Sequence, residues 1–443
     1  MDGSQLRRLR PELESFLDRY VGLFGRAENH QHARQLVQGL LDGSDRRNVE
    51  NMAEAVQGGV VRTLQKFIAE GSWQDRGVLG ELRRQVVETL GDDEAVMNVD
   101  ETGFPKKGTK SVGVQRQYAG ILGRVDNCQI GVFLNYTSEA GHALLDRRLF
   151  LPQDWANDGQ RRKEAGVPEG VVFRTKPELA LEMVAEAVAA EMPFGWVAGD
   201  SLYGDSPTFV QGLRALRKCY VLDVSSEARV WLRCPRRTRS GKAEERPISV
   251  AEAARRLPRD AWKRVTIAEG SQGPRVYDYA ELIAWFSEEG IPTPSFERLL
   301  IRRSLGQEPE MKYQRSNAPM QIKLQRLAEV GGSRWTIEQD FQAAKGECGL
   351  DEYETRGWTG WHHHTALSML ALLFLAIQRK RLGEKRAPDE CSRGACRAPT
   401  PARSPQVGRR GNPSMVRMAS AAESPSQVKS RTSPRRLPVP ATA

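Results

Sequence analysis

The chain has 443 residues, which is enough for two or three domains of roughly 150 residues each. Lys and Arg number 66 against 56 Asp and Glu, a net charge of +10, and residues 380–443 alone hold 14 of these basic residues and 4 of the acidic ones. The excess positive charge therefore belongs to the C-terminal segment, which excludes overall charge as an argument that the rest of the chain binds nucleic acid.

Residues 5–90 show the spacing of apolar residues that is typical of amphipathic helices. Phe16, Tyr20 and Phe24 follow one another at intervals of four, and residues 42–45 break the pattern before it resumes. We predict an all-α domain over residues 1–93.

The periodicity changes at residue 94, where short apolar runs predict strands. These runs are residues 95–100, 117–122, 129–136, 196–200 and 219–224. Between them, Thr175 and Glu178 form a capping-box pattern that opens a helix. Residues 94–224 therefore predict the first part of an α/β core.

The remainder of the chain divides into three segments. Residues 225–330 contain strand-like runs separated by Gly, Pro and charged turns, which predicts a β-rich insertion. Helical patterns return over residues 331–381. Residues 382–443 are rich in Arg, Pro and Ser and have too little apolar surface to offset the entropy of ordering, so we predict a disordered basic tail.

Features of membrane or exported proteins are missing from the pattern. The most apolar stretch, residues 366–377, falls well short of the ~20 residues that span a bilayer, and predicts a buried core helix. The first residues lack the apolar run of a signal peptide, and the six cysteines form no CxxC pair. We expect a cytoplasmic protein with reduced thiols and no contact with membranes.

Two acids, Asp100 and Asp200, each end a predicted strand. Functional groups gather at such ends, and converging carboxylates suit a hard divalent cation such as Mg2+. A turn with Lys106 and Lys107 follows Asp100, and a basic turn beside a metal site suits a DNA backbone. The alternatives are acids that cap turns and an ordinary charged turn; the pattern alone does not choose.

A third candidate acid, Glu338, shares one helical stripe with Arg334 and Lys345. Such a stripe suits a metal-binding carboxylate whose neighbours hold phosphate oxygens. It equally suits a solvated face with an i,i+4 ion pair. Three adjacent histidines, His362, His363 and His364, point about 100° apart on a helix and do not readily share one metal ion; we expect His364 to serve in packing or hydrogen bonding.

Three motifs together resemble the DDE transposases of bacterial insertion sequences, most of all the insertion-sequence-701 type, which is related to the insertion-sequence-4 group. They are VDETGFPKKG at residues 99–108, GDSLYG at 199–204, and RWTIE at 334–338 with Lys345-Gly346 following. The resemblance covers about residues 10–378 in the right order. It implies an α/β fold: a ribonuclease-H-like catalytic core with a β-rich insertion, preceded by an all-α domain that recognises DNA.

The resemblance also implies roles for individual residues. Asp100, Asp200 and Glu338 would be the catalytic, metal-binding triad, and Arg334 and Lys345 would contact transposon-end DNA. Gly331 stands where the group's signature has Tyr. Tyr203, beside Asp200, suits either a DNA contact or packing beneath the strand end.

The function implied is cut-and-paste DNA transposition with Mg2+, for which Mn2+ would substitute. The partners implied are the terminal inverted repeats of the element, target DNA and a second copy of the chain in the DNA complex. Two rivals stay open: a catalytically inactive, transposase-derived DNA-binding protein or repressor, and a metal nuclease of the same fold without strand transfer.

Overall fold

The computed structural model describes residues 9–43, 46–120, 123–270, 273–306 and 308–386. They all belong to one compact unit, Met1–Asp389. The last helix, α15 (Trp358–Arg386), continues through residues 382–386, and the rest of the predicted disordered tail lies outside the described residues. Within the described ranges no helix combines the length and the apolar character that a membrane crossing requires.

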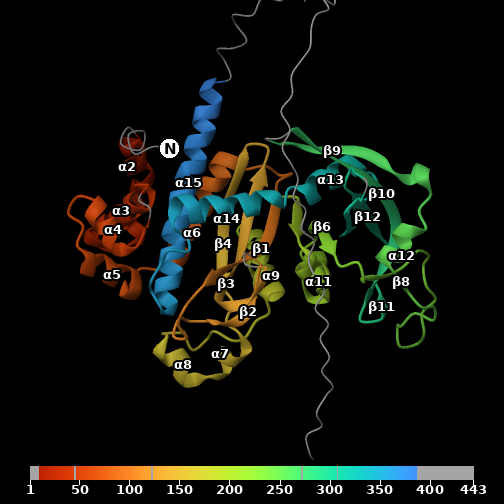
Figure 1. The fold of residues 1–443 in the computed structure, drawn as a ribbon, viewed down its shortest axis with the longest axis horizontal. Coiled ribbons are helices and arrows are strands. Elements are labelled where there is room, and N and C mark those ends of the chain that lie inside the picture. The colour runs from red at the N-terminus through yellow and green to blue at the C-terminus, as the bar shows by residue number, and fades with distance from the viewer. Residues whose placement is uncertain (1–8, 44–45, 121–122, 271–272, 307, 387–443) are drawn as a thin grey trace, which may run out of the picture. The chain divides into compact units, whose positions relative to one another are not determined.

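Helices make up the regular structure described up to residue 90. They are α2 (Arg10–Asp18), η1 (Val21–Leu23), α3 (Ala27–Leu41), α4 (Val49–Ala55), α5 (Val61–Glu70) and α6 (Asp75–Leu90). The long helix α15 contacts α3, α5 and α6 and also strand β4 (Gly141–Leu149), and α6 contacts β4 as well, so α15 and α6 connect the N-terminal helices to the sheet (Figure 1). One continuous apolar core runs from Leu13 to Leu375. The N-terminal helices therefore share the core of the sheet, and a domain boundary at residue 93 stays a prediction.

The described strands form one mixed sheet, and its first part carries the predicted acids. These strands are β1 (Val96–Pro105), β2 (Gln115–Ala119), β3 (Arg124–Ser138), β4, β5 (Trp196–Gly199) and β6 (Cys219–Val224). Strand β3 is antiparallel to both β1 and β4, whereas β5 is parallel to both β1 and β6. The helices between them are α7 (Gln153–Asn157), α8 (Gly159–Glu164), α9 (Lys176–Ala189), α10 (Ser201–Gly204) and α11 (Pro207–Ala215). The capping box predicted at Thr175 is confirmed at the start of α9.

Strand β4 is missing from the sequence-based order, because Asp146, Arg147 and Arg148 interrupt its apolar pattern. All three charges are compensated inside the fold. Asp146 is fully buried and pairs with Arg148 at 2.9 Å, and Arg147 pairs with Asp75 of α6 at 2.7 Å. Because its charged residues form ion pairs inside the fold, β4 is a core strand although its sequence is that of a polar segment.

Residues 225–330 are rich in strands, but those strands extend the core sheet instead of forming a separate one. The elements are β7 (Arg229–Trp231), β8 (Ile248–Ser249), α12 (Val250–Arg255), η3 (Arg259–Ala261), β9 (Lys263–Gly270), β10 (Gly273–Glu288), β11 (Ile291–Pro292), β12 (Glu297–Arg303) and β13 (Met311–Ser316). Strand β13, which the sequence did not predict, pairs antiparallel with β6 and so joins the two parts. Helices α13 (Leu324–Gly332) and α14 (Trp335–Cys348) then return to the core.

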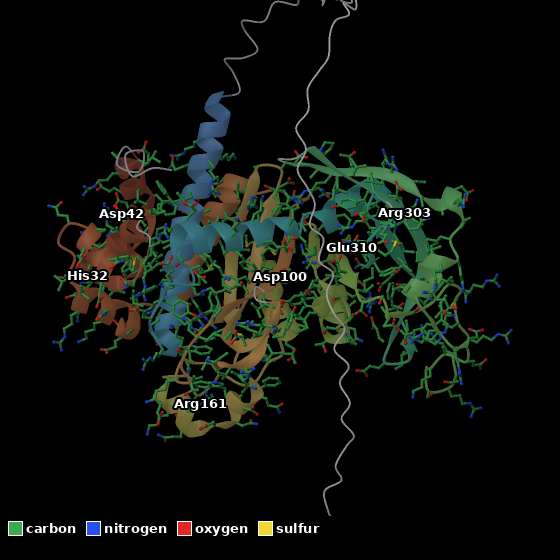
Figure 2. The ribbon with its side chains drawn as sticks, viewed as in Figure 1. His32, Asp42, Asp100, Arg161, Arg303 and Glu310 are labelled. Atoms are coloured by element: carbon green, nitrogen blue, oxygen red, sulfur yellow. The ribbon has the colours of Figure 1, made fainter. Side chains whose placement is uncertain are left out.

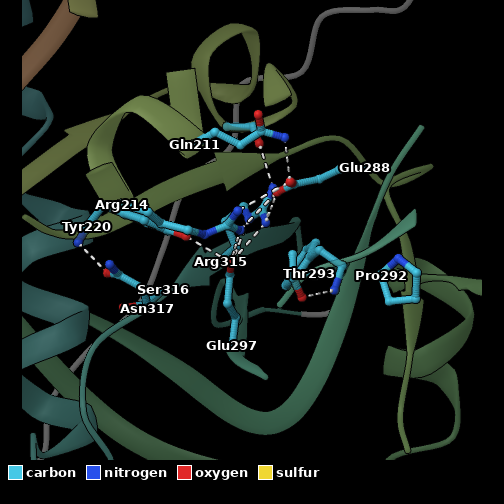
Figure 3. Close-up of polar contacts among 12 residues, drawn as sticks. Gln211, Arg214, Tyr220, Glu288, Pro292, Thr293, Glu297, Arg315, Ser316 and Asn317 are labelled. Carbon is cyan, nitrogen blue, oxygen red and sulfur yellow. Dashed lines mark hydrogen bonds and ion pairs between the residues drawn. The ribbon is translucent and has the colours of Figure 1, made fainter. Parts of the chain in front are cut away.

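A buried cluster of charged residues ties these added strands to the core (Figure 3). Glu297 of β12 accepts hydrogen bonds from Arg315 of β13, from Arg214 of α11 and from the hydroxyl of Tyr220. Glu288 at the end of β10 also accepts hydrogen bonds from both arginines, from Arg214 at 2.9 Å and from Arg315 at 3.1 Å. Because Glu297 and Arg315 are 2% and 4% exposed, their charges depend on one another for compensation.

Candidate active site

The register of two parallel strands brings Asp100 and Asp200 together. Val96–Val99 of β1 pair with Trp196–Gly199 of β5, so each acid is the first residue past the paired stretch. Asp100 was predicted to end its strand, and this is wrong: β1 continues to Pro105 because its second half still pairs with β3. What ends at this point is β5, and Asp100 lies among the central strands (Figure 2).

A further acid stands at the end of the neighbouring strand. Asp200 caps α10, accepting the Leu202 amide at 2.9 Å, and Asp223 lies near the end of β6. Gly204 lets α10 lie directly on β6, since a Cβ there would sit 1.9 Å from the Asp223 carbonyl oxygen. Asp200, Asp223 and Arg334 line one hollow of about 310 Å³.

Glu338 reaches this group through Arg334. The Nη2 atom of Arg334 lies 3.6 Å from Oδ2 of Asp100 and 3.7 Å from Oε1 of Glu338, and its Nη1 lies 3.0 Å from Oδ2 of Asp223. The Glu338 side chain is 67% exposed, whereas those of Asp100 and Arg334 are 16% and 17% exposed. Across the part of the chain that the structure describes, no three His, Cys, Asp or Glu side chains lie close enough to hold an ion, and Arg334 stands between Asp100 and Glu338.

A buried polar seam fixes the position of α14 on the sheet. Thr336 contacts Thr137 of β3 at 2.6 Å, and Asp340 accepts hydrogen bonds from Asn135 at 2.6 Å. Ser333 donates to Asn98 of β1 at 3.0 Å. Because buried polar groups require matched partners, these bonds set the register of α14 and therefore the place of Glu338 relative to Asp100.

Burial and like charges dominate the electrostatics of the acids. Burial, together with the neighbouring carboxylates of Asp200 and Glu101, raises the pKa of Asp100 to about 7 against the opposing effect of Arg334. Burial likewise raises the pKa of Asp200. The pKa of Arg334 is raised despite its burial, because Asp223, Asp100 and Asp200 surround it. The carboxylate oxygens that surround the Arg334 guanidinium are the type of ligand that a hard divalent cation prefers.

The pKa of Asp100 predicts a stability difference at high pH. The folded state holds this proton up to about pH 7 and the unfolded chain only up to about pH 4, so the free energy of unfolding falls as the pH rises through that window. Asp100→Asn removes the buried charge. We expect the free energy of unfolding of the variant, measured with urea in metal-free buffer, to exceed that of wild type by roughly 1–4 kcal/mol at pH 8. This difference should shrink toward pH 4. Identical pH profiles for the two proteins would contradict the assignment.

The predicted lysines differ in how accessible they are. Lys345 donates to Thr102 at 2.8 Å and to the Gly103 carbonyl at 3.2 Å, and its burial lowers its pKa. Lys106 lies 3.5 Å from the centre of the Tyr353 ring, and burial lowers its pKa to about 8. Lys107 is exposed in the turn after β1. A DNA contact by Lys107 needs no rearrangement, whereas Lys345 and Lys106 are held by the protein.

Tyr203 is fully buried, and its hydroxyl donates to Glu101 at 2.8 Å. This placement favours the packing role over a DNA contact. Glu101 also pairs with Lys176 at the start of α9, at 2.8 Å. Tyr203 and Lys176 thus hold the residue next to Asp100 from two different helices.

The three histidines contact different backbone carbonyls. His362 bonds to Trp358, His363 to Ile68 and Trp73, and His364 to Gly349. The prediction of a hydrogen-bonding role for His364 is confirmed. Together these bonds tie the start of α15 to the N-terminal helices and to the end of α14.

Sequence reasoning overlooked two features of this region. Asp223 follows the same pattern of an acid at the end of a predicted strand, and that pattern would have identified it. The second feature is the segment between β7 and β8, residues 232–247, in which five exposed cations form no ion pair within the described residues: Arg233, Arg236, Arg239, Lys242 and Arg246. Arg237 in this segment donates to the carbonyl of Thr293 at 2.9 Å.

Comparison with known proteins places the chain in a family. The model of the family described as DDE superfamily endonuclease matches residues 19–274, more than half of the chain, including Asp100 and Asp200 and ending before Glu338. The chain therefore belongs to the DDE superfamily endonucleases. It is similar to the "Probable transposase for insertion sequence element IS701" of Microchaete diplosiphon, at 27% identity over 221 residues, which are 48% of this chain and 54% of that protein. The chain thus spans about half the length of the curated relative it matches, and the resemblance drawn from the three motifs is confirmed.

Proposed function

We propose that the chain is a transposase that cleaves the ends of an insertion sequence and joins them to target DNA. The single observation that carries this proposal is the convergence of Asp100, Asp223 and Glu338 on Arg334, with Asp200 lining the same hollow. These residues come from segments far apart in the sequence. Strands β4, β3, β1, β5 and β6 would form the ribonuclease-H-like core, and the strands after β6 its β-rich insertion.

In this proposal Asp100, Asp200 and Glu338 hold divalent cations, with Mg2+ as the physiological ion and Mn2+ as a substitute. Bound metal would supply an activated water or DNA 3′-hydroxyl and would stabilise the leaving oxygen. The protein's own contribution is positioning. The β1–β5 register fixes Asp100 beside Asp200, and the polar seam of α14 holds Glu338 opposite them.

The exposed cations supply the DNA contacts in this proposal. Lys107 in the turn after β1 and the five exposed cations between β7 and β8 suit phosphate oxygens, and each phosphate contact releases counterions. Arg334 and Lys345 would turn from their protein partners to the element end. Two ends must meet for transposition, so we propose a homodimer in the DNA complex, with the N-terminal helices recognising the inverted repeats.

The test is cleavage of the element's paired terminal repeats by the full chain. We expect Mg2+ to support cleavage and, with supercoiled target DNA, joining of the ends; Ca2+ should support binding without cleavage. Cleavage without joining would identify a metal nuclease of the same fold instead. Binding without any cleavage in Mg2+ or Mn2+ would contradict the proposal and favour an inactive DNA-binding protein.

A further inference from the structure

Arg334 contacts three acids, and the proposed reaction needs two of them, Asp100 and Glu338, for another purpose. Its guanidinium contacts carboxylates from three elements, namely Asp100 on β1, Asp223 on β6 and Glu338 on α14. The side chains of Arg334, Asp100 and Asp223 are 16–17% exposed, so solvent screens these two pairs only weakly, whereas Glu338 meets Arg334 from the solvent side at 67% exposure. In the DNA-free protein this one side chain therefore serves as the counter-ion of the acidic group.

A divalent cation and this guanidinium compete for the same oxygens. One nitrogen of Arg334 lies within 3.7 Å of carboxylate oxygens of both Asp100 and Glu338. A Mg2+ ion coordinates such oxygens at about 2.0–2.1 Å, and two cations at such close range repel one another strongly in a poorly screened site. Loading Asp100 and Glu338 with metal thus requires Arg334 to withdraw from them.

Arg334 is not fully satisfied by its present contacts. Its shortest ion pair is with Asp223, which lines the same hollow as Arg334, Lys312 and Tyr313, and its buried Nε atom has no hydrogen-bond partner in this arrangement. Guanidinium groups bind phosphate through paired N–H donors. A DNA phosphate at this hollow offers the charge of Arg334 a partner other than Asp100 and Glu338.

We infer that Arg334 couples DNA binding to metal loading. Without DNA, Arg334 occupies Asp100 and Glu338 and weakens the binding of divalent cations. A DNA phosphate draws the guanidinium away and frees both acids, so that DNA and metal strengthen each other's binding by the same factor. This inference rests on the proposed function and adds an order of binding: the catalytic site takes up its full complement of metal only after DNA has bound.

The test is calorimetric titration with Ca2+, which leaves the DNA uncut, using the full chain with and without a duplex of the element end and a DNA-only blank. We expect DNA to tighten Ca2+ binding to wild type at least about fivefold. Arg334→Gln should bind Ca2+ at least about fivefold more tightly than wild type without DNA, with little further gain from DNA. Arg334→Lys keeps the positive charge and should stay near wild type. The control is Arg326→Gln, the same change in a side chain of α13 that pairs with Glu94; it should bind Ca2+ as wild type does, with and without DNA.

The outcomes separate this inference from the function on which it rests. Equal DNA-free affinities of wild type and Arg334→Gln overturn the inference while leaving the metal site intact. Wild-type affinity that DNA does not change overturns it as well, and this comparison requires no variant to fold. Failure of every form to bind Ca2+, with or without DNA, overturns the proposed metal site itself.

Discussion

Asp100→Asn is expected to reduce Mg2+-dependent cleavage of the terminal repeats by at least about 10³-fold while DNA affinity stays within about twofold of wild type. Asn has nearly the shape of Asp and keeps the β1–β5 register, but it supplies one neutral oxygen where the proposed chemistry needs an anionic ligand. The measurements are single-turnover cleavage of labelled repeat DNA and a parallel binding titration in Ca2+.

The matched control is Glu139→Gln, which removes an exposed carboxylate at the turn between β3 and β4. It should cleave like wild type. We expect Asp100→Asn to be the more stable protein at pH 8, and urea unfolding in the cleavage buffer checks that lost activity does not come from unfolding. Equal cleavage by wild type and Asp100→Asn would remove Asp100 from the active site and with it the proposed catalytic triad.

Local chemistry made much of this architecture predictable. A capping box needs four consecutive residues, and the helix it predicted at Thr175 is present. Short apolar runs predicted β1, β5 and β6, and with them the two strands that bring Asp100 and Asp200 together. Each of these inferences depends on residues close to one another in the sequence, where periodicity and turn chemistry carry the information.

Pairing between distant segments could not be predicted in the same way. The charged run of β4 reads as a surface segment until Asp75 of α6 and Arg83 are seen to compensate it. Strand β13 is short, and only its pairing with β6 shows that the added strands extend one sheet. The ion pairs of Arg334 with Asp100 and Asp223 join residues more than one hundred positions apart, so helical spacing identified its contact with Glu338 alone.

The residue at position 331 shows how packing departs from a family signature. Gly331 lies on α13, and a Cβ there would come within 2.6 Å of the Gln314 side chain on β13. Gln314 in turn donates to Asp223 at 2.8 Å. A larger residue would displace the Gln314 amide from Asp223, which gives a structural reason for glycine where the related signature has Tyr.

Glu297→Gln is expected to destabilise the fold by roughly 1.5–3 kcal/mol, because it removes one of the two carboxylates that face the guanidinium groups of Arg315 and Arg214 and leaves only Glu288 to compensate them. The measurement is urea unfolding followed by tryptophan fluorescence. The matched control is Glu252→Gln, which breaks the exposed pair with Arg256 on α12 and should cost less than about 1 kcal/mol. The junction of β12, β13 and α11 joins the added strands to the β6 end of the acidic site, so repeat-DNA cleavage by Glu297→Gln should also fail at a lower temperature than in wild type. Equal losses of stability in the two variants would show that the charges at this junction are hydrated and that apolar packing alone holds the added strands to the core.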